Sequence, residues 1–483
     1  MSRIDPLDVP RPDAQLHFGV FFQGVNHWTI WSAPDSGSQI DPASFRKVAQ
    51  TAERGLFDAF FLGEGLRLRE VDGKIHDLDV AGRPDAITQL AALAAVTRRI
   101  GLVSTSNSTF NEPADLARRL SGLDLLSAGR AGWNVVTTDN AWTGANFRRG
   151  GYLDHADRYR RAEEFLTVAR ALWNGWEDGA VAGSAHAPAW SAPGAVHPVR
   201  HKGPQFDVDL VPTLPRSAQG HPVIFQAGDS GEGRDFAALN ADVIFSAHGT
   251  DFDDALAFAH DIRRRLRAVG RPDDAVRILP GTEIILGATE EEAREKKRWI
   301  RLQQVTPATA LGIAGLLWGI DLSGRDADGP LPKEDPVVTD NDGSFGARRI
   351  ADPRAVVAEW RAKAEAHGWS LRETVIALGP QRGHVGTPSG LADKFAHFVR
   401  HGAIDGFNIT PYLIPDGLDD IVDLLVPELQ ERGVYRTEYT GTTLREHLGL
   451  RAPLDTGPGH MTDKKLSHAD RNAAASGARS GLT

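Results

Sequence analysis

The sequence predicts an α/β protein folded as a (β/α)8 TIM barrel with insertions. Short runs rich in β-branched and aromatic residues alternate with longer stretches whose apolar residues recur at helical spacing. This alternation is typical of parallel strands joined by crossover helices. The pattern repeats eight times, and a chain of 483 residues, of which 41% are hydrophobic, is long enough for one barrel with insertions.

Eight strands and their following helices are predicted in chain order. The predicted strands cover residues 16–22, 57–62, 100–105, 131–136, 223–227, 242–245, 276–286 and 406–410. The predicted helices cover residues 42–54, 84–97, 113–126, 154–174, 290–301 and 418–431, with two more near 235 and 253. A further helix is expected to begin at Pro388, because proline fits the first turn of a helix. The fourth helix shows a clear buried face, since Ala162, Leu166 and Ala169 recur at helical spacing.

Two stretches interrupt the alternation and are predicted to be insertions. Residues 179–219 and 305–383 are much longer than the connections of roughly 2–6 residues that usually join such elements. We therefore expect one barrel domain over residues 1–450 that carries both insertions. Residues 451–483 contain many Gly, Ser, Ala and Lys residues, and they are expected to form a mobile tail or an arm that packs on another subunit.

Composition excludes several classes of function. The net charge of −10 provides no basic surface for nucleic acid or for an anionic membrane. The sequence has no cysteine, and His186, His197, His201 and His221 lack tight ligand spacing, so no metal site is predicted and these histidines are expected at the surface. Residues 1–15 carry charges and prolines in place of an apolar leader, and no apolar run approaches the roughly 18 residues that span a membrane. We expect a cytoplasmic protein that acts on a small molecule.

Polar and aromatic residues follow the predicted strands. Active sites of β/α barrels form where strands end and helices begin, so these residues are expected to converge on one mouth. The loop after the first strand contains a histidine and two indoles, and polar residues follow the next three strands. The candidates at the first four strand ends are His27, Trp31, Glu64, Thr105 and Asn134.

Two further features could form an anion site at the same mouth. His155 and Tyr159 lie four residues apart and extend the buried stripe of the fourth helix, so both are expected to face inward, whereas Arg161 is expected to be exposed. A histidine and a phenol there can donate to a phosphate, or they can be ordinary interface residues. The glycine-rich run around Ser230 opens a helix whose free N–H groups favour a phosphate, or it is simply a helix cap. The acidic Asp229 argues against an anion unless it points to solvent.

The order of these motifs resembles the nitrilotriacetate, dibenzothiophene-sulfone and long-chain-alkane monooxygenases of the bacterial luciferase-like superfamily. The resemblance covers roughly residues 16–435. It rests on His27-x-x-x-Trp31-x-x-Pro34, Thr51-Ala52-Glu53-Arg54-Gly55, Gly101-Leu102-Val103-Ser104-Thr105 with Asn111-Glu112-Pro113, Gly129-Arg130-Ala131-Gly132-Trp133-Asn134-Val135-Val136-Thr137, His155-x-x-Arg158-Tyr159-x-x-Ala162-Glu163-Glu164-Phe165 and Gly220-His221-Pro222-Val223-Ile224-Phe225-Gln226-Ala227-Gly228.

The resemblance implies the oxygenase component of a two-component flavin-dependent monooxygenase. Such an enzyme takes reduced FMN from a separate NAD(P)H:flavin reductase, reacts it with O2 and transfers one oxygen atom to a small organic substrate. It implies flavin contacts at Thr105, Asn134, His155, Tyr159 and Ser230, the last three toward the phosphate. Many relatives have aspartate after the second strand where this chain has Glu64, so a flavin contact of altered geometry is expected there.

Roles in the reaction and the choice of substrate are less constrained. His27 is assigned to hydrogen bonding or proton donation near the reactive edge of the flavin and Trp31 to substrate packing, although both could simply wall the pocket. The charge runs 263–267 and 296–301 are expected to be exposed helix faces, and no basic cluster stands out to bind a polycarboxylate. A neutral, apolar or sulfur-containing substrate is therefore favoured, and a homo-oligomer (dimer or tetramer) is expected.

Two alternatives remain at this point. One is a deazaflavin-dependent oxidoreductase on the same barrel, and the other is a flavin-binding protein without turnover. A glycosidase is not favoured, because Glu64 and Glu283 occur in no motif that pairs carboxylates. Oxygen consumption in the presence of a flavin reductase distinguishes the monooxygenase from the other flavin-binding possibilities.

Overall fold

The computed structural model is built on one curled sheet of parallel strands. The structure describes residues 10–26, 28–68, 70–71, 74–75, 81–138, 141–147, 155–181, 189–337, 352–379 and 383–453. In spatial order the sheet is β11-β10-β9-β6-β5-β2-β1-β15-β12. The strands are β1 His17–Phe22, β2 Ala59–Leu62, β5 Gly101–Asn107, β6 Ala131–Val136, β9 Val223–Gln226, β10 Val243–Ile244, β11 Arg277–Ile278, β12 Gly281–Thr282 and β15 Gly406–Ile409.

The two ends of this sheet are parts of one stretch of chain, so the sheet closes on itself. On one side of that stretch, the backbone N–H of Leu279 donates to the carbonyl of Ile244 at 2.8 Å. On the other side, the N–H of Asn408 donates to the carbonyl of Pro280 at 2.9 Å. Proline has no N–H to contribute, which accounts for the break between β11 and β12. The result is an eight-stranded parallel barrel, and the predicted fold class is confirmed.

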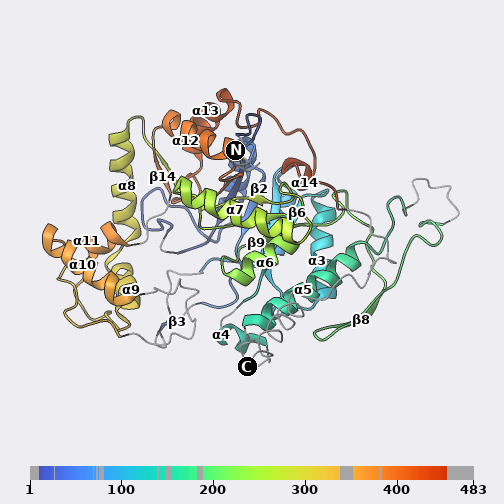
Figure 1. Ribbon diagram of the computed structural model, residues 1–483, viewed down its shortest axis with the longest axis horizontal. Coiled ribbons are helices and arrows are strands. Elements are labelled where there is room, and N and C mark those ends of the chain that lie inside the picture. Colours follow the sequence, from blue (N-terminus) through green and yellow to red (C-terminus); the bar gives the residue numbers. More distant parts are fainter. Residues whose placement is uncertain are drawn as a thin grey trace, which may run out of the picture.

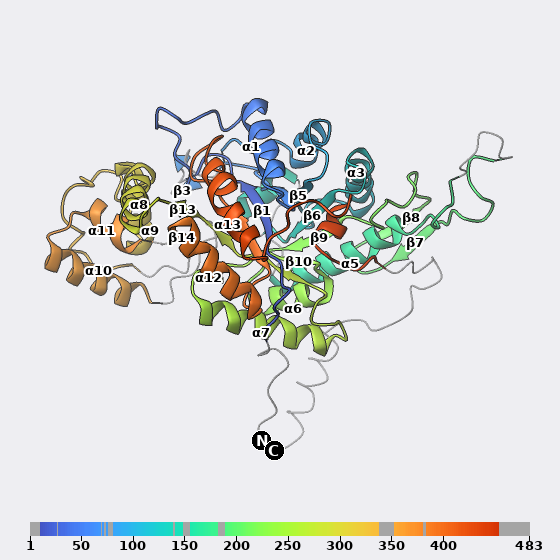
Figure 2. The ribbon, with the colours of Figure 1, turned by 90° about the horizontal axis from the view of Figure 1, so that it is seen from above.

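Helices surround the strands (Figures 1 and 2). They are α1 Pro42–Arg54, α2 Ala86–Ala94, α3 Pro113–Leu126, α5 His155–Trp173, α6 Gly231–Asn240, α7 Phe252–Ala268, α12 Pro388–Arg400 and α13 Val426–Glu431. The main apolar core lies between helices and strands and includes Leu62, Leu102, Trp133 and Phe407. Inside the barrel, rings fill the space: Phe61 packs edge-on against Phe21 and Phe225, at ring separations of 5.0 and 6.0 Å. The interior of the barrel is therefore a packed core, and in this fold the reactive site lies at the carboxyl ends of the strands.

The segment predicted as a seventh strand over residues 276–286 departs from the barrel after β12. Its last part, β13 Ile284–Leu286, pairs with β14 His384–Gly386, outside the main sheet. Helix α8 Glu290–Gln304 then runs back beside these two strands. The end of α8 thereby returns to the strand ends of the barrel.

Residues 305–383, predicted as an insertion, contain three helices that the sequence analysis did not predict. These are α9 Pro307–Trp318, α10 Pro353–His367 and α11 Leu371–Leu378. They enclose an apolar cluster of their own, with Trp318 packed edge-on against Trp360 at 6.1 Å. Figure 2 places them at one end of the molecule and the hairpin of β7 Val199–Lys202 and β8 Asp207–Leu210 at the other.

Smaller elements complete the structure. These are the hairpin β3 Glu70–Val71 with β4 Lys74–Ile75, the short helices α4 Ala141–Gly144 and α14 Leu444–His447, and the 3-10 turn η2 Ala145–Phe147. The helix predicted over 418–431 is in fact a π-helical turn, Ile421–Leu425, followed by α13. In the described part of the chain, no helix combines the length and apolarity needed to cross a membrane. Of the predicted C-terminal tail, residues 454–483 lie outside the described residues.

An ion pair ties the segment after α13 to the amino-terminal end of the barrel. Asp58, just before β2, is fully buried, and its carboxylate accepts hydrogen bonds from Arg436 and from the backbone N–H of Phe18, the latter at 2.9 Å. His17 Nδ1 lies 3.1 Å from the same carboxylate. Despite burial, the positive charge of Arg436 holds the pKa of Asp58 below its usual value.

Candidate active site

Thr105 and Asn134 lie side by side at the carboxyl ends of two neighbouring strands. They are register partners on β5 and β6, and Asn134 Nδ2 donates to Thr105 Oγ1 at 3.0 Å. Both side chains are buried, and they face the barrel axis because Trp133 and Val135 occupy the outer face of β6. Asn134 Oδ1 is buried and has no hydrogen-bond partner. A buried polar atom without a partner is costly, so this oxygen marks a place where a ligand can donate.

Glu64 follows β2 and faces Asn107, at the end of β5. Both Glu64 oxygens lie 3.0 Å from Asn107 Nδ2, and Oε1 also accepts from the Asn107 backbone N–H at 3.3 Å. Burial raises the pKa of Glu64 to about 7, although the Asn107 donors favour the ionised form. The carboxylate that sequence analysis selected therefore changes charge near neutral pH.

The loop after β9 approaches helix α5 through two glycines. Ser230 caps α6, and its Oγ accepts from the N–H of Gly233 at 3.1 Å. A Cβ on Gly233 would lie 2.9 Å from the Gly228 backbone and 3.0 Å from the phenol oxygen of Tyr159. The structure thus brings Tyr159 and Ser230 to one glycine-lined loop at a helix N-terminus. His155 is the first residue of α5, and its side chain lies outside the described residues.

The acidic residue in this loop, Asp229, has a positively charged partner. Asp229 lies 3.0 Å from Arg234 Nη2 and 3.2 Å from His248 Nε2. His248 Nδ1 in turn lies 2.9 Å from Asp254, and Arg234 also pairs with Asp261 at 3.1 Å. The objection that Asp229 raises against an anion is therefore weaker than the sequence suggests. Arg234 and His248 were missed, because nothing in the sequence indicates that they face this loop.

The loop after β1 is held against the end of α8. His27 lies outside the described residues. Trp31 is 51% exposed, whereas the neighbouring Trp28 is buried. Gln304 Nε2 donates to the Trp28 carbonyl at 2.6 Å and to Glu283 Oε1 at 3.0 Å. The loop that carries the predicted catalytic residues is thus fixed to the seventh strand.

Four surface expectations were wrong. Arg263, in the run 263–267 that was expected to be exposed, is buried. Arg301, expected on an exposed charge run, is buried and donates to Gln304 Oε1 at 3.1 Å. Arg161 is also buried, because it turns inward to donate to the Ser108 carbonyl at 3.0 Å and stacks over Phe206. His221 is buried against the indole of Trp173, at a ring separation of 5.6 Å. For Arg161, backbone carbonyls and the Phe206 ring offset the cost of burial, whereas Arg301 Nε and His221 Nδ1 are buried without a hydrogen-bond partner.

Comparison with known proteins decides the family. Residues 16–404 match the family described as luciferase-like monooxygenase. The chain belongs to this family. It is 40% identical to the N-acetyl-S-(2-succino)cysteine monooxygenase of Bacillus subtilis, over 91% of this chain and 98% of the relative. It is 38% identical to nitrilotriacetate monooxygenase component A of Aminobacter aminovorans, over 92% and 98% of the two chains. The crystal structure of DmoA from Hyphomicrobium sulfonivorans superposes with a TM-score of 0.77 at 30% identity, covering 95% of this chain and 98% of that one.

These findings confirm the predicted enzyme class. The chain is a monooxygenase of the luciferase-like family, as the sequence predicted. The deazaflavin alternative is not favoured, because its structural representatives share only 13–14% identity with the chain and so show the fold alone.

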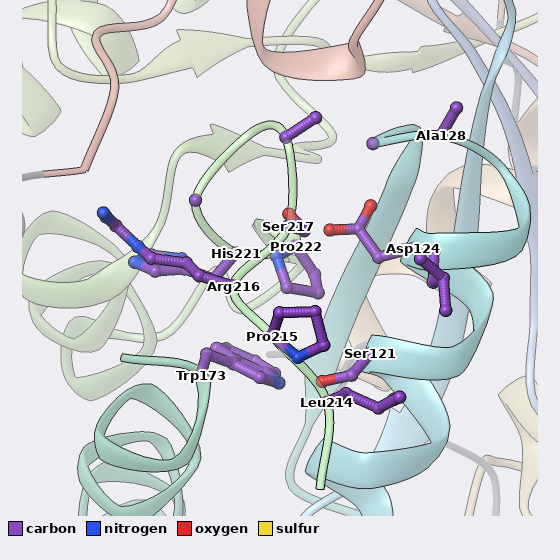
Figure 3. A pocket seen from close by; sticks show the side chains of 14 residues that line it. Ser121, Asp124, Ala128, Trp173, Leu214, Pro215, Arg216, Ser217, His221 and Pro222 are labelled. Carbon is purple, nitrogen blue, oxygen red and sulfur yellow. The ribbon is translucent and has the colours of Figure 1, made fainter. Parts of the chain in front are cut away.

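The monooxygenase also has a cavity of about 120 Å³ at the opposite end of the barrel. Asp124, Trp173, Arg216 and His221 line it, beside the segments that lead into β6 and β9 (Figure 3). In β/α barrels the amino-terminal ends of strands carry stability rather than chemistry. The cavity is therefore separate from the site described above. Among the described residues, no group of three or more His, Asp or Glu side chains could hold a metal ion.

The raised pKa of Glu64 predicts a pH-dependent stability. An unfolded glutamate ionises near its ordinary pKa of 4.5, whereas folded Glu64 retains its proton up to about pH 7. Folding is therefore progressively penalised as the pH rises through this interval, and the penalty is constant above it. We expect Glu64→Gln to raise the melting temperature relative to the native protein at about pH 8 but much less at about pH 4.5, with a free-energy difference on the order of 1–3 kcal/mol. The control is the exposed Glu431→Gln; an equal effect of Glu64→Gln at both pH values would contradict the prediction.

Proposed function

We propose that the cofactor of this luciferase-like monooxygenase is reduced FMN, bound between the strand ends of β5 and β6 and the loop after β9. The observation that carries the proposal is the close approach of Tyr159, Gly228 and Gly233 at the start of α6. Only glycine leaves room there, and the free N–H groups of a helix N-terminus favour a phosphate. No dinucleotide fingerprint occurs in the sequence, which favours a single phosphate over FAD.

The residues present fit such a flavin at both of its ends. Asn134 Oδ1, buried and without a partner, can accept from a ring N–H, and Thr105 holds the amide in place. Ser230, Tyr159 and His155 would hold the phosphate, and Glu64 would lie beside the ring system. Bound reduced flavin supplies the electrons with which O2 is activated, while the protein orients the reactants and excludes water.

The loop after β1 would complete the site on the substrate side. We propose that His27 provides a hydrogen bond or proton near the reacting atoms and that Trp31 packs on the substrate. The half-exposed indole of Trp31 is available for such packing. The reduced flavin would come from a separate NAD(P)H:flavin reductase in the cytoplasm, and the oxygenase would act as a homodimer or homotetramer.

Reconstitution tests this proposal. The purified chain is expected to bind FMN more tightly than FAD in a fluorescence titration, and to oxidise essentially no NADH by itself. Addition of a flavin reductase and NADH should lead to oxygenation of one compound from a panel of N-acetyl-S-(2-succino)cysteine, nitrilotriacetate, dibenzothiophene sulfone, dimethyl sulfide and a long-chain alkane. Equal or tighter binding of FAD, or rapid NADH oxidation by the chain alone, would contradict the proposal. Flavin binding without any substrate-dependent oxygen consumption would instead favour the non-catalytic alternative.

A further inference from the structure

On one face of helix α8, positively charged side chains point toward the protein interior rather than toward solvent. The face consists of Ala293, Lys297, Ile300, Arg301 and Gln304, which recur at helical spacing. Ala293, Ile300, Arg301 and Gln304 are buried, and Lys297 is partly buried. The opposite face carries Glu291, Arg294 and Arg298 at the surface. The α8 inner face is thus a mostly buried stripe that carries two positively charged side chains, Lys297 and Arg301.

This inner face meets the loop that carries the predicted substrate residues. The Arg301 guanidinium lies 5.8 Å from the ring centre of Trp28, three residues before Trp31. Gln304, one turn further along α8, holds the Trp28 carbonyl at 2.6 Å. Arg301 is therefore placed beside the β1 loop, next to the proposed substrate pocket, and Lys297 lies one turn before it on the same face of α8.

The described residues do not fully compensate the charges of Lys297 and Arg301. Arg301 Nε is buried without a hydrogen-bond partner, and within the described residues Lys297 makes no hydrogen bond or ion pair. Against the effect of burial, the negative charge of Glu283 acts to raise the pKa of both cations, and Glu283 Oε1 accepts from Gln304. Within the described part of the chain, one negative charge thus acts on two positive charges. Such burial is unfavourable unless another anion arrives.

The electrostatics of Lys297 agree with this imbalance. Burial and the neighbouring charge of Arg301 lower the pKa of Lys297, against the opposing effect of Glu283. Lys296, the adjacent residue, differs: it pairs with Asp420 at 2.5 Å, and its pKa is raised. Among the described residues, Lys296 therefore has an acidic partner and Lys297 has none.

We propose that Lys297 and Arg301 bind a carboxylate of the substrate, so that this monooxygenase acts on an organic acid rather than on a neutral sulfide, sulfone or alkane. The proposal rests on the proposed function, because it requires the substrate to lie at the β1 loop beside the flavin. It reverses the expectation of a neutral substrate, which followed from counting the 296–301 run as an exposed face. A guanidinium and an ammonium together match the geometry and charge of a carboxylate.

The test measures binding and turnover separately in the full chain. Protein saturated with FMN is titrated calorimetrically with N-acetyl-S-(2-succino)cysteine, with its trimethyl ester and with nitrilotriacetate. The native protein should bind at least one of the two acids and bind the ester much more weakly. Lys297→Gln and Arg301→Gln should each weaken binding of the acid roughly ten- to a hundredfold, the range expected for one charge-assisted hydrogen bond. Lys297→Arg should keep most of the native affinity for the acid.

A matched control removes the same charge from the other face of the same helix. Arg298→Gln, whose side chain is 68% exposed, should leave acid binding unchanged. FMN affinity and melting temperature should also be unchanged in Lys297→Gln. Binding of the ester as tight as that of the acid, saturable binding of neither acid, or equal acid affinities in Lys297→Gln and Arg298→Gln would each overturn the inference. Failure of the native protein to bind FMN would instead overturn the proposed function, so the two failures are distinguishable.

Discussion

Replacing Gly233 with alanine is expected to abolish most of the affinity for FMN while leaving the barrel folded. The added Cβ would lie 2.9 Å from the Gly228 backbone, closer than real Cβ atoms approach, and 3.0 Å from the Tyr159 phenol oxygen, which is tighter than most real contacts. The loop must therefore open, which separates the helix N-terminus from the phenol that would share the phosphate. The loss of one or two charge-assisted hydrogen bonds corresponds to roughly a hundredfold or more in dissociation constant.

Gly231→Ala is a precise control for this change. Gly231 begins the same helix, and a Cβ there has nothing within 4 Å. Alanine is also the better helix former, so this variant should bind FMN normally and melt at the same or a slightly higher temperature. FMN titrations of both variants by fluorescence, with thermal melts, measure the difference. Equal affinity in Gly233→Ala and Gly231→Ala would show that the phosphate does not lie at this loop.

Replacing Asp58 with alanine is expected to cause the largest loss of stability. Asp58 is fully buried, and its removal leaves Arg436 without its carboxylate and the Phe18 N–H without its acceptor. Breaking a buried ion pair from one side typically costs about 3–5 kcal/mol. The unfolding free energy from urea denaturation should fall by this order. Because the pKa of Asp58 is lowered, the stability that it contributes is present above its ordinary pKa and is lost as the pH falls below it.

The comparison for Asp58 is a carboxylate of the same type at the surface. Asp423 pairs with Arg54 on the outside of the barrel, where both side chains are about half exposed. Exposed pairs contribute about 0–1 kcal/mol, so Asp423→Ala should change the denaturation midpoint little. Equal effects of the two substitutions would show that the Asp58 pair is not a principal link between the C-terminal segment and the barrel.

The barrel was predictable because each strand is a short apolar run with turn-forming residues on either side. Strands such as 131–136 are buried on both faces, and such strands appear in the sequence as short, nearly continuous apolar runs. The three helices of 305–383 were missed although their caps are visible in the sequence: Thr306 and Asp352 each precede a proline, and Ser370 with Glu373 forms a capping box. The length of this segment indicates an insertion, whereas its caps indicate that the insertion is helical.

The site was predictable where it depends on strand order and not where it depends on side-chain direction. Thr105 and Asn134 are adjacent because consecutive strands of a barrel are neighbours. Arg301 was misread because a run of charges indicates solvent, although Ala293, Ile300 and Gln304 mark the same face of the helix as buried. The contacts of Asp229 with Arg234 and His248 depend on how separate segments meet, and no local pattern encodes them.

Closure of the barrel has a consequence for how the chain is made. Strand β1 pairs on one side with β2, but its other neighbour is β15, which ends at Ile409. During synthesis on the ribosome, one edge of β1 stays unpaired until β15 has been translated, which is near the end of the polypeptide. An unpaired strand edge is a template for association with other chains. Nascent chains that stall before β15 should therefore aggregate or recruit chaperones, whereas chains released after Ile409 can seal the ring.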